Sequence, residues 1–495
     1  MGFKIIHFLH RFIYVIFFAL LLFLVGLNIY MSRGYSSLSM HMPEYFNIIT
    51  LIVAVLIAVC LFRFREKVRT FFEIVPPSLA VVGLLGISLA LQLIVVKELN
   101  VNPSWDFRAV VDSATRFVET GDMGEYYTIY PNNILLTCIL VVIGKIISPD
   151  LIVFQILNVI VITLSQFLIY RIATKVAGKA VGIASLLMSV LFFPYFFYSP
   201  VVYTDTFSLV FLLLPLNLLI NKEGEFKEDI FFIIAASILF SFGMLLKGSL
   251  IIFTIAFSIV LLLNQKKWRK VYFIIPFIIL LVVKSLFSSG LYQFNILDKE
   301  KVEERSMPVT HWIVMSQNED HLGKYSQEDV DWTKSLLEKY PRSKVTELHF
   351  QEFKNRIAEK GFAGNIQFNI EKIGHTWTDG TYYSLNKLRR FPEHPEHFEH
   401  LMDHKSGHIL QGYARVQHLV ILLGLLLALR LKEKKSIISF TKLSVIGFFL
   451  FFIIWETRSR YLVSLTPLMI MLSCMGYLDN KNDQKGLSEN NKISH

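Results

Sequence analysis

The sequence has little charge and few cysteines for its length. Only 18% of its 495 residues are Asp, Glu, Lys or Arg, whereas 54% are hydrophobic, and a soluble domain cannot bury that much apolar surface. The cysteines Cys60, Cys138 and Cys474 lie in apolar runs without paired spacing, which excludes a disulfide framework and a cysteine-based metal site. Glycine-rich patterns of the GxGxxG or P-loop type are also absent, so no nucleotide cofactor is implied.

The apolar residues are gathered in long runs of the kind that cross a lipid bilayer as helices. The first run is long for a signal peptide and no small-residue cleavage site precedes Arg33, so we expect it to be retained as a span. The chain is therefore predicted to be an all-α polytopic membrane protein with about 12 transmembrane helices. The predicted spans are residues 12–31, 45–62, 77–96, 151–170, 180–198, 206–220, 230–246, 249–264, 271–287, 409–429, 436–455 and 461–478.

The basic residues between these runs indicate which way the chain crosses. The net charge of +10 is spread over short Lys and Arg clusters between apolar runs, a distribution that speaks against nucleic-acid binding. One further apolar run, 132–148, is short and ends near Lys145, which favours a helix lying along the outer surface. If it does not cross, both termini are cytoplasmic and the basic clusters all lie inside, as the positive-inside rule requires. We therefore expect a multi-pass protein of the plasma membrane.

This topology places large segments of the chain on the external face. Residues 97–148 and 199–206 would be external loops of an N-terminal transmembrane module. A long external loop would follow and cap the membrane part, before the chain returns to the bilayer and ends in a disordered cytoplasmic tail. The predicted domains, in order, are 1–287, 288–408, 409–478 and 479–495.

Two acidic residues are predicted to lie externally at the starts of helices. Asp106 follows Trp105 at the head of an amphipathic stretch, and Asp205 precedes an apolar run. Aspartate is common at the N-terminal cap of a helix, so each side chain could simply accept hydrogen bonds from the free backbone amides there. A carboxylate at the membrane boundary also suits proton transfer in catalysis. We take Asp106 and Asp205 as candidate catalytic residues, with Trp105, Arg108 and Tyr203 as neighbours that bind substrate.

Cationic residues are predicted on the same external face. Lys247 lies in a tight turn between two apolar runs, where reaching the membrane surface is the ordinary alternative to a binding role. Arg458 and Arg460 lie in the short turn before the last span, against the charge bias of the other loops. Arginine offers paired donors to phosphate. These three residues are candidates for binding a donor phosphate, with Glu456 and Tyr461 beside them; pairing of the arginines with Glu456 alone is the alternative.

The first external loop also carries an aromatic and amide cluster. It reads "EYYTIYPNN" and supplies Tyr126, Tyr127, Tyr130, Asn132 and Asn133. Such tyrosines are typical of the aromatic belt at a membrane surface. The same residues also suit a wall that stacks on a sugar and donates hydrogen bonds to it. Both interpretations stay open for this segment.

The chain resembles the GT-C superfamily of membrane glycosyltransferases. "SWDFRA" resembles the acidic motif of the first external loop in bacterial family 39, which includes protein O-mannosyltransferase-like and aminoarabinose transferase-like proteins. "SPVVYTDTFS" resembles the second acidic motif, "LLKGSLII" the lysine-containing turn, and "ETRSRYLVSLTP" the arginine-tyrosine motif near the end. The likeness covers roughly 1–287 and 409–478. One departure is that Asp106 is followed by Phe107, where the family often has a second acidic residue.

The long external loop carries histidines that the motifs do not explain. "PVTHWIVMSQN" and "WTDGTYYS" resemble external segments of integral membrane proteins from Gram-positive bacteria. His311 is a candidate substrate-binding residue, with a packed, hydrogen-bonded histidine as the alternative. In "EHPEHFEHLMDHKSGH", the spacing would place four histidines on one helix face, unless Gly407 ends the helix before His408. A divalent metal ion with Asp403 assisting is the alternative to a solvated face. These histidines are His397, His400, His404 and His408.

The resemblance implies a glycosyltransferase that takes a sugar from undecaprenyl phosphate on the outer face. The acceptor hydroxyl would belong to a cell-wall polymer, a glycolipid or a secreted protein, and a single displacement would invert the anomeric centre. This interpretation requires no cofactor. A transporter or flippase for a lipid-linked sugar is the alternative function, although transporters usually carry ionisable residues near the membrane midplane and often show two related halves. A noncatalytic protein that binds a lipid-linked sugar is a third.

Overall fold

The computed structural model describes residues 2–31, 36–37, 40–41, 44–402, 404–431 and 435–478. Helices make up nearly all of this part, and a short antiparallel pair joins β1 (Ser36–Ser37) to β2 (Met40–His41). The polypeptide is thus an all-α polytopic membrane protein, as the apolar runs predict. The predicted disordered tail, 479–495, lies outside the described residues.

Eight helices of the described part are long and apolar enough to cross a membrane. Their mean hydropathy over 18 residues ranges from 1.4 to 2.7, and a helix of about 20 residues spans the hydrocarbon core. They are α1 (Gly2–Tyr30), α2 (Glu44–Arg63), α4 (Pro77–Glu98), α8 (Leu151–Ala177), α14 (Ile275–Gln293) with η4 (Lys267–Ile274), α21 (Lys405–Ala428), α22 (Ser436–Ile454) and α23 (Thr466–Leu478) with η5 (Ser459–Leu465).

Four of the twelve predicted spans coincide with shorter apolar helices. The run 180–198 is divided because α9 ends at Val190 and a separate helix begins at Phe193, with Pro194 in its first turn. The run 206–220 falls on α11, and 230–246 and 249–264 are separated by the turn at Lys247. These shorter helices are α9 (Lys179–Val190), α11 (Thr204–Leu219), α12 (Ile230–Leu246) and α13 (Ile251–Asn264), and α10 (Phe193–Phe197) and η3 (Gly248–Leu250) connect them.

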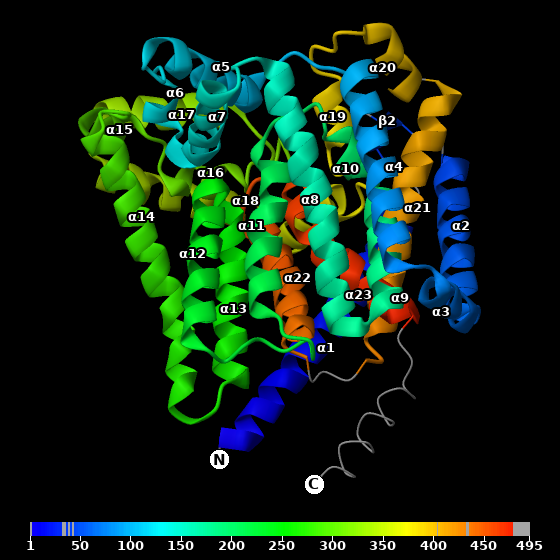
Figure 1. Cartoon of the computed structure of the whole chain (residues 1–495). Coiled ribbons are helices and arrows are strands. Elements are labelled where there is room, and N and C mark those ends of the chain that lie inside the picture. Colours follow the sequence, from blue (N-terminus) through cyan, green and yellow to red (C-terminus); the bar gives the residue numbers. More distant parts are fainter. Residues whose placement is uncertain are drawn as a thin grey trace.

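One end of the bundle collects the segments that were predicted to be external. Figure 1 shows α1 beginning at the lower end, near which α3 (Arg65–Ile74) also lies. At the upper end lie α5 (Trp105–Thr120), α6 (Tyr126–Ile129) and α7 (Ile134–Ile146), with η2 (Pro131–Asn133) leading into α7. The helix of the run 132–148 thus packs beside α5 at this end.

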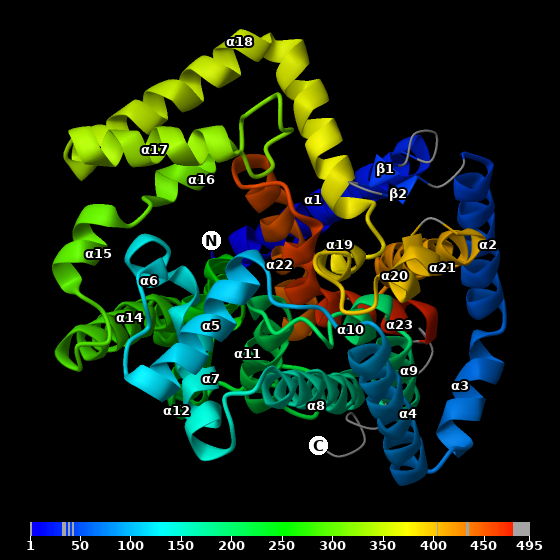
Figure 2. The same ribbon diagram turned by 90° about the horizontal axis from the view of Figure 1, so that it is seen from above.

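The long loop between α14 and α21 is also helical and lies at the upper end. Figure 2 shows α15 to α18 forming an arc around one side of the bundle, with α19 and α20 nearer its middle. A buried ion pair between Arg356 and Asp329, 2.7 Å apart, fastens α17 to α18. Regular helix continues to Trp377, past a kink at Gly361 whose φ of 61° suits glycine. The elements are α15 (Lys299–Arg305), α16 (Val309–Met315), α17 (Gln327–Lys339), α18 (Arg342–Trp377), α19 (Ser384–Leu388) and α20 (Pro395–Met402).

The histidine-rich segment is not one helix, and the break lies before Lys405 rather than at Gly407. α20 ends at Met402 and α21 begins at Lys405, so His397 and His400 belong to one helix and His408 to the next. Gly407 packs closely on the end of α20: a Cβ at Gly407 would lie 2.4 Å from the Leu401 carbonyl oxygen. Asp403 lies outside the described residues.

Candidate functional site

A buried ion cluster lies where three turns of the chain meet. Asp205 stands in the first turn of α11, Lys247 ends α12, and Arg460 lies in η5. The Lys247 ammonium donates to Asp205 Oδ1 at 2.7 Å, and Arg460 Nη1 lies 3.5 Å from Asp205 Oδ2. The Asp205 side chain is fully buried and Lys247 is 5% exposed. Such charges are stable in a low-dielectric interior only when they compensate one another, so the three residues form one unit.

A second carboxylate, Asp106, is linked to this cluster through Tyr203. The Tyr203 hydroxyl donates to Asp106 Oδ2 at 3.1 Å and accepts from Asn133 Nδ2 at 2.9 Å. The Tyr126 hydroxyl donates to Asp106 Oδ1 at 3.0 Å. Arg460 lies over the Tyr203 ring, 5.2 Å from its centre. Asp106 is only half-buried, so it remains accessible while two tyrosines fix its orientation.

The turn before the last helix contributes a further group. Arg458 Nε donates to Glu456 Oε1 at 2.9 Å, and the Tyr461 hydroxyl donates to Glu456 Oε2 at 3.0 Å. Arg458 Nη1 also reaches the Tyr383 hydroxyl at 3.3 Å. Lys247 and Arg460 each lie about 5 Å from the centre of the Tyr461 ring. Tyr461 thus joins the Glu456–Arg458 pair to the buried ion cluster.

The long upper loop supplies two more cations to the same place. Lys387 is buried in α19 and its ammonium lies 4.9 Å from the centre of the Tyr203 ring. Burial, together with the nearby Arg460 charge, lowers the pKa of Lys387 to about 7. Arg390 donates to the Tyr383 hydroxyl at 3.1 Å and lies 5.6 Å from the centre of the Trp105 ring.

A tight turn at Asp379 holds this part of the loop. Asp379 accepts from the backbone amides of Thr381 and Tyr383 and, at 2.6 Å, from the Ser459 hydroxyl. Tyr382 and Tyr383 both have positive φ, 49° and 69°, which non-glycine residues rarely adopt. Backbone strain of this kind persists where the surroundings impose it, often at functional sites. The turn therefore fixes Tyr383 against Arg458.

The structure brings most of the predicted site residues together. Asp106, Asp205, Lys247, Arg458 and Arg460 belong to one continuous set of contacts. Tyr130 packs on Tyr126, with ring centres 5.4 Å apart, and Trp105 lies at the edge, 59% exposed and with a positive φ of 51°. The other predicted residues within the set are Tyr126, Asn133, Tyr203, Glu456 and Tyr461.

Two predicted substrate-binding residues, Arg108 and His311, make their contacts elsewhere, and Tyr127 and Asn132 touch only the edge of the set, where the Tyr127 and Tyr126 ring centres are 5.1 Å apart. Arg108 forms an exposed ion pair with Asp112 at 3.0 Å, and Tyr127 is buried against the Thr137 hydroxyl. Asn132 is exposed and reaches only as far as the Asn133 side chain. His311 is buried in the long loop, where its Nδ1 bonds to the Thr333 hydroxyl at 2.8 Å. Burial lowers the pKa of His311 to about 4, so it is a neutral packed histidine at neutral pH.

The sequence did not lead us to predict that Asp379, Tyr383, Lys387 and Arg390 belong to the site. A signal was present, because "NKLRR" (386–390) is a basic run in a segment predicted to be external. Like Arg458 and Arg460, it runs against the positive-inside bias. With these additions, the described residues of the site comprise five cationic side chains and four carboxylates. An accessible carboxylate beside clustered cations can accept a proton while an anionic group is held close by.

Comparison with known proteins gives a family and one structural likeness. A family model described as "Conserved hypothetical integral membrane protein" matches residues 2–480. No curated protein matches the chain. One similar solved structure is an oligosaccharyltransferase of Archaeoglobus fulgidus, tethered through a disulfide to an acceptor peptide with an NVT sequon. The alignment has 11% identity and a TM-score of 0.30, and covers 81% of this chain but 56% of that one. A TM-score that low does not establish a shared fold.

Proposed function

The chain belongs to the conserved hypothetical integral membrane protein family, and we propose that it is a membrane glycosyltransferase of the GT-C type. It moves a sugar from a polyprenyl-phosphate donor, such as undecaprenyl phosphate, to a hydroxyl group of a cell-envelope acceptor. One observation carries this proposal: the half-buried carboxylate of Asp106 is joined through Tyr203 to a cluster of buried cations. The combination suits a reaction in which a hydroxyl loses its proton and a phosphate leaves.

In the proposed reaction, Asp106 is the general base. Its carboxylate takes the proton of the acceptor hydroxyl while that oxygen bonds to the anomeric carbon of the sugar. The bond from that carbon to the phosphate oxygen breaks, and polyprenyl phosphate leaves with the electron pair. A single displacement inverts the anomeric centre. Tyr126 and Tyr203 hold the carboxylate so that it meets the incoming hydroxyl.

The cations would stabilise the phosphate as negative charge develops on it. Arg458 and Arg460 offer planar, paired donors, and Lys387 adds a charge over Tyr203. Asp205 lies fully buried between Lys247 and Arg460, which favours a role in placing these cations over direct contact with the acceptor. No protein nucleophile is needed.

The proposed orientation follows from the charge distribution. The upper end of Figure 1, which carries the site, would face the outside of the plasma membrane, and the end where α1 begins would face the cytoplasm. In this arrangement α15 to α20 would be the cap that we predict for residues 288–408. The lipid-linked donor would enter from the outer leaflet, and the acceptor would be a cell-wall polymer, a glycolipid or a secreted protein.

Substituting Arg458 tests the phosphate-binding role. We expect Arg458→Ala to raise the KM for the lipid-linked donor roughly 10–100-fold, since hydrogen bonds to charged groups contribute about 1.5–3 kcal/mol. The measurement is transfer from a defined polyprenyl-phosphate sugar by the purified protein in detergent. Arg116→Ala is the matched control, because Arg116 pairs with Asp122 on the exposed surface. Equal KM values in both variants would contradict the assignment.

The pH dependence of donor affinity tests Lys387. Its pKa lies near 7 because of burial and the Arg460 charge, so Lys387 is protonated below that pH and loses its charge above it. We expect donor affinity to fall as pH rises through about 7. Lys387→Arg should remain charged and show a flatter profile between pH 6 and 9, because arginine stays protonated in that range. If the donor affinity of the wild-type protein does not change over the same pH range, Lys387 does not contribute to donor binding.

A further inference from the structure

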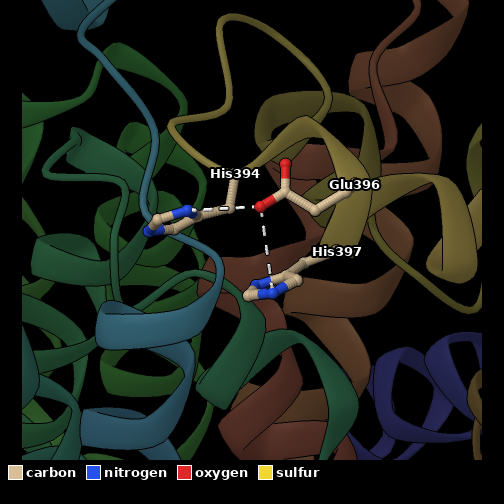
Figure 3. Close-up of side chains that lie close together, drawn as sticks. All are labelled: His394, Glu396 and His397. Atoms are coloured by element: carbon tan, nitrogen blue, oxygen red, sulfur yellow. Dashed lines mark ion pairs between the residues drawn. The ribbon is translucent and has the colours of Figure 1, made fainter.

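A second cluster of polar side chains lies beside α20, apart from the groups that bind the proposed substrate. Figure 3 shows His394, Glu396 and His397 pointing toward one another. Glu396 Oε1 lies 3.5 Å from His394 Nδ1 and 4.0 Å from His397 Nε2. One ligand atom from each of the three residues lies within 4.8 Å of the other two. All three residues are at least partly exposed, so an ion from solvent can reach them.

The backbone before this cluster is fixed against the end of α4. Val101 and Pro392 form an antiparallel bridge, and the Glu393 amide donates to the Asn100 carbonyl oxygen at 2.9 Å. The Asn100 side chain donates to Glu393 Oε2 at 3.0 Å. These bonds fix the backbone just before the cluster, so His394 and His397 do not lie on a free loop.

The hydrogen bond of His397 shows which of its ring nitrogens is available. Its Nδ1 lies 2.9 Å from the carbonyl oxygen of Glu98, the last residue of α4. A carbonyl oxygen only accepts, so Nδ1 carries the proton and the neutral ring presents the lone pair of Nε2 on the side of Glu396. Histidines that bind metals usually donate their other ring N–H to a carbonyl or carboxylate in this way. The His397 ring is therefore oriented as a metal ligand would be.

We propose that His394, Glu396 and His397 bind a Zn²⁺ ion at the start of α20, where the His397 ring also bonds to the end of α4. Two imidazole nitrogens and one carboxylate oxygen form a common zinc ligand set, with a fourth position left for water. Tetrahedral bonds of about 2.0–2.1 Å separate ligand atoms by roughly 3.3 Å, so shifts of about 1 Å or less in these side chains complete the site. This proposal does not depend on the proposed transfer reaction.

The ion would fix the His397 ring, which bonds to the residue before the first upper loop, rather than take part in the transfer reaction. The segment after Glu98 leads directly into α5, which begins at Trp105 and carries Asp106. On the other side of the bridge, Arg390 contacts the Trp105 ring. Zinc bound by the three ligands would hold the His397 ring in the orientation that bonds to the Glu98 carbonyl oxygen, so the three ligands are positioning residues.

Zinc content and zinc-dependent stability of the full-length protein in detergent test the proposal. After EDTA treatment and titration with ZnCl₂, we expect one Zn²⁺ per chain by mass spectrometry of the metal. We also expect the apparent melting temperature to rise by a few degrees, because an ion that binds only the folded state stabilises it. His394→Ala and His397→Ala should lose both the ion and the shift. His397→Gln, which keeps a polar side chain of similar reach, should also lose the ion without a change in the zinc-free melting temperature.

The neighbouring histidines provide matched controls. The His400 and His404 rings lie 4.7 Å apart on the same segment, and His400→Ala and His404→Ala should keep the stoichiometric ion. Three outcomes would overturn the proposal. They are wild-type protein without stoichiometric zinc, zinc retained by both the His394 and His397 variants, and zinc lost in the His400 or His404 variants but kept in the others.

Discussion

Asp106→Asn should lower sugar transfer by about 10²–10⁴-fold, the usual contribution of a general base. The amide is close in size to the carboxylate and can still accept from Tyr203, whose hydroxyl lies 3.1 Å from Oδ2. It cannot take the proton of an incoming hydroxyl. The protein should therefore fold and bind the lipid-linked donor while kcat falls. Transfer and donor binding, both measured on purified protein, separate these effects.

Asp112→Asn is the matched control for this substitution. Asp112 lies on the same helix, is exposed and pairs with Arg108 at 3.0 Å, so its loss should leave kcat within a factor of two or so, as expected for an exposed pair of small energy. Unchanged transfer in Asp106→Asn would show that another group accepts the proton. Lost donor binding in that variant would instead assign Asp106 to substrate binding.

Asp205→Ala should destabilise the protein by about 3–5 kcal/mol, the usual cost of removing one partner from a buried ion pair. The substitution leaves Lys247, 5% exposed, without its 2.7 Å partner and removes the carboxylate beside Arg460. The unfolding midpoint in denaturant should fall clearly, with loss of transfer as a consequence. The measurement is unfolding in detergent followed by tryptophan fluorescence.

The control for stability is Asp112→Ala, since removing an exposed ion pair costs about 1 kcal/mol or less. A double variant, Asp205→Ala with Lys247→Met, should recover part of the loss because it removes the stranded ammonium group. If Asp205→Ala unfolds at the same denaturant concentration as Asp112→Ala, the three charges do not act as one buried unit.

Much of the architecture could be predicted because lipid-facing helices have a strong composition signal. Long apolar runs identified the eight helices that are long enough to cross. The helix boundaries inside 180–264 were harder to predict from the sequence, because Pro194 and the turn at Lys247 divide continuous apolar sequence. In the histidine segment, the sequence indicated a possible helix end at Gly407, whereas α20 ends at Met402 and Gly407 lies in α21, close to the Leu401 backbone.

The acidic and arginine residues of the site could be selected because charge in an apolar chain is conspicuous. Which of these residues contact one another could not be predicted from the sequence. Tyr203 was selected as a neighbour of Asp205, yet its hydroxyl bonds to Asp106 instead. Lys387 and Arg390 were not identified because the sequence does not show that their long loop packs onto the site, where Lys387 is buried. The turn at Asp379, held by the Ser459 hydroxyl, is one of the contacts that bring that loop onto the site.

The most direct test is mass spectrometry of the cell envelope from a strain that lacks this protein. The proposal predicts that one sugar substituent disappears from an envelope polymer, glycolipid or secreted protein, and that its polyprenyl-phosphate form accumulates. Wild-type protein should restore the substituent and Asp106→Asn should not. An unchanged envelope, or full restoration by Asp106→Asn, would contradict a catalytic role, and the second result would favour a transporter of the lipid-linked sugar.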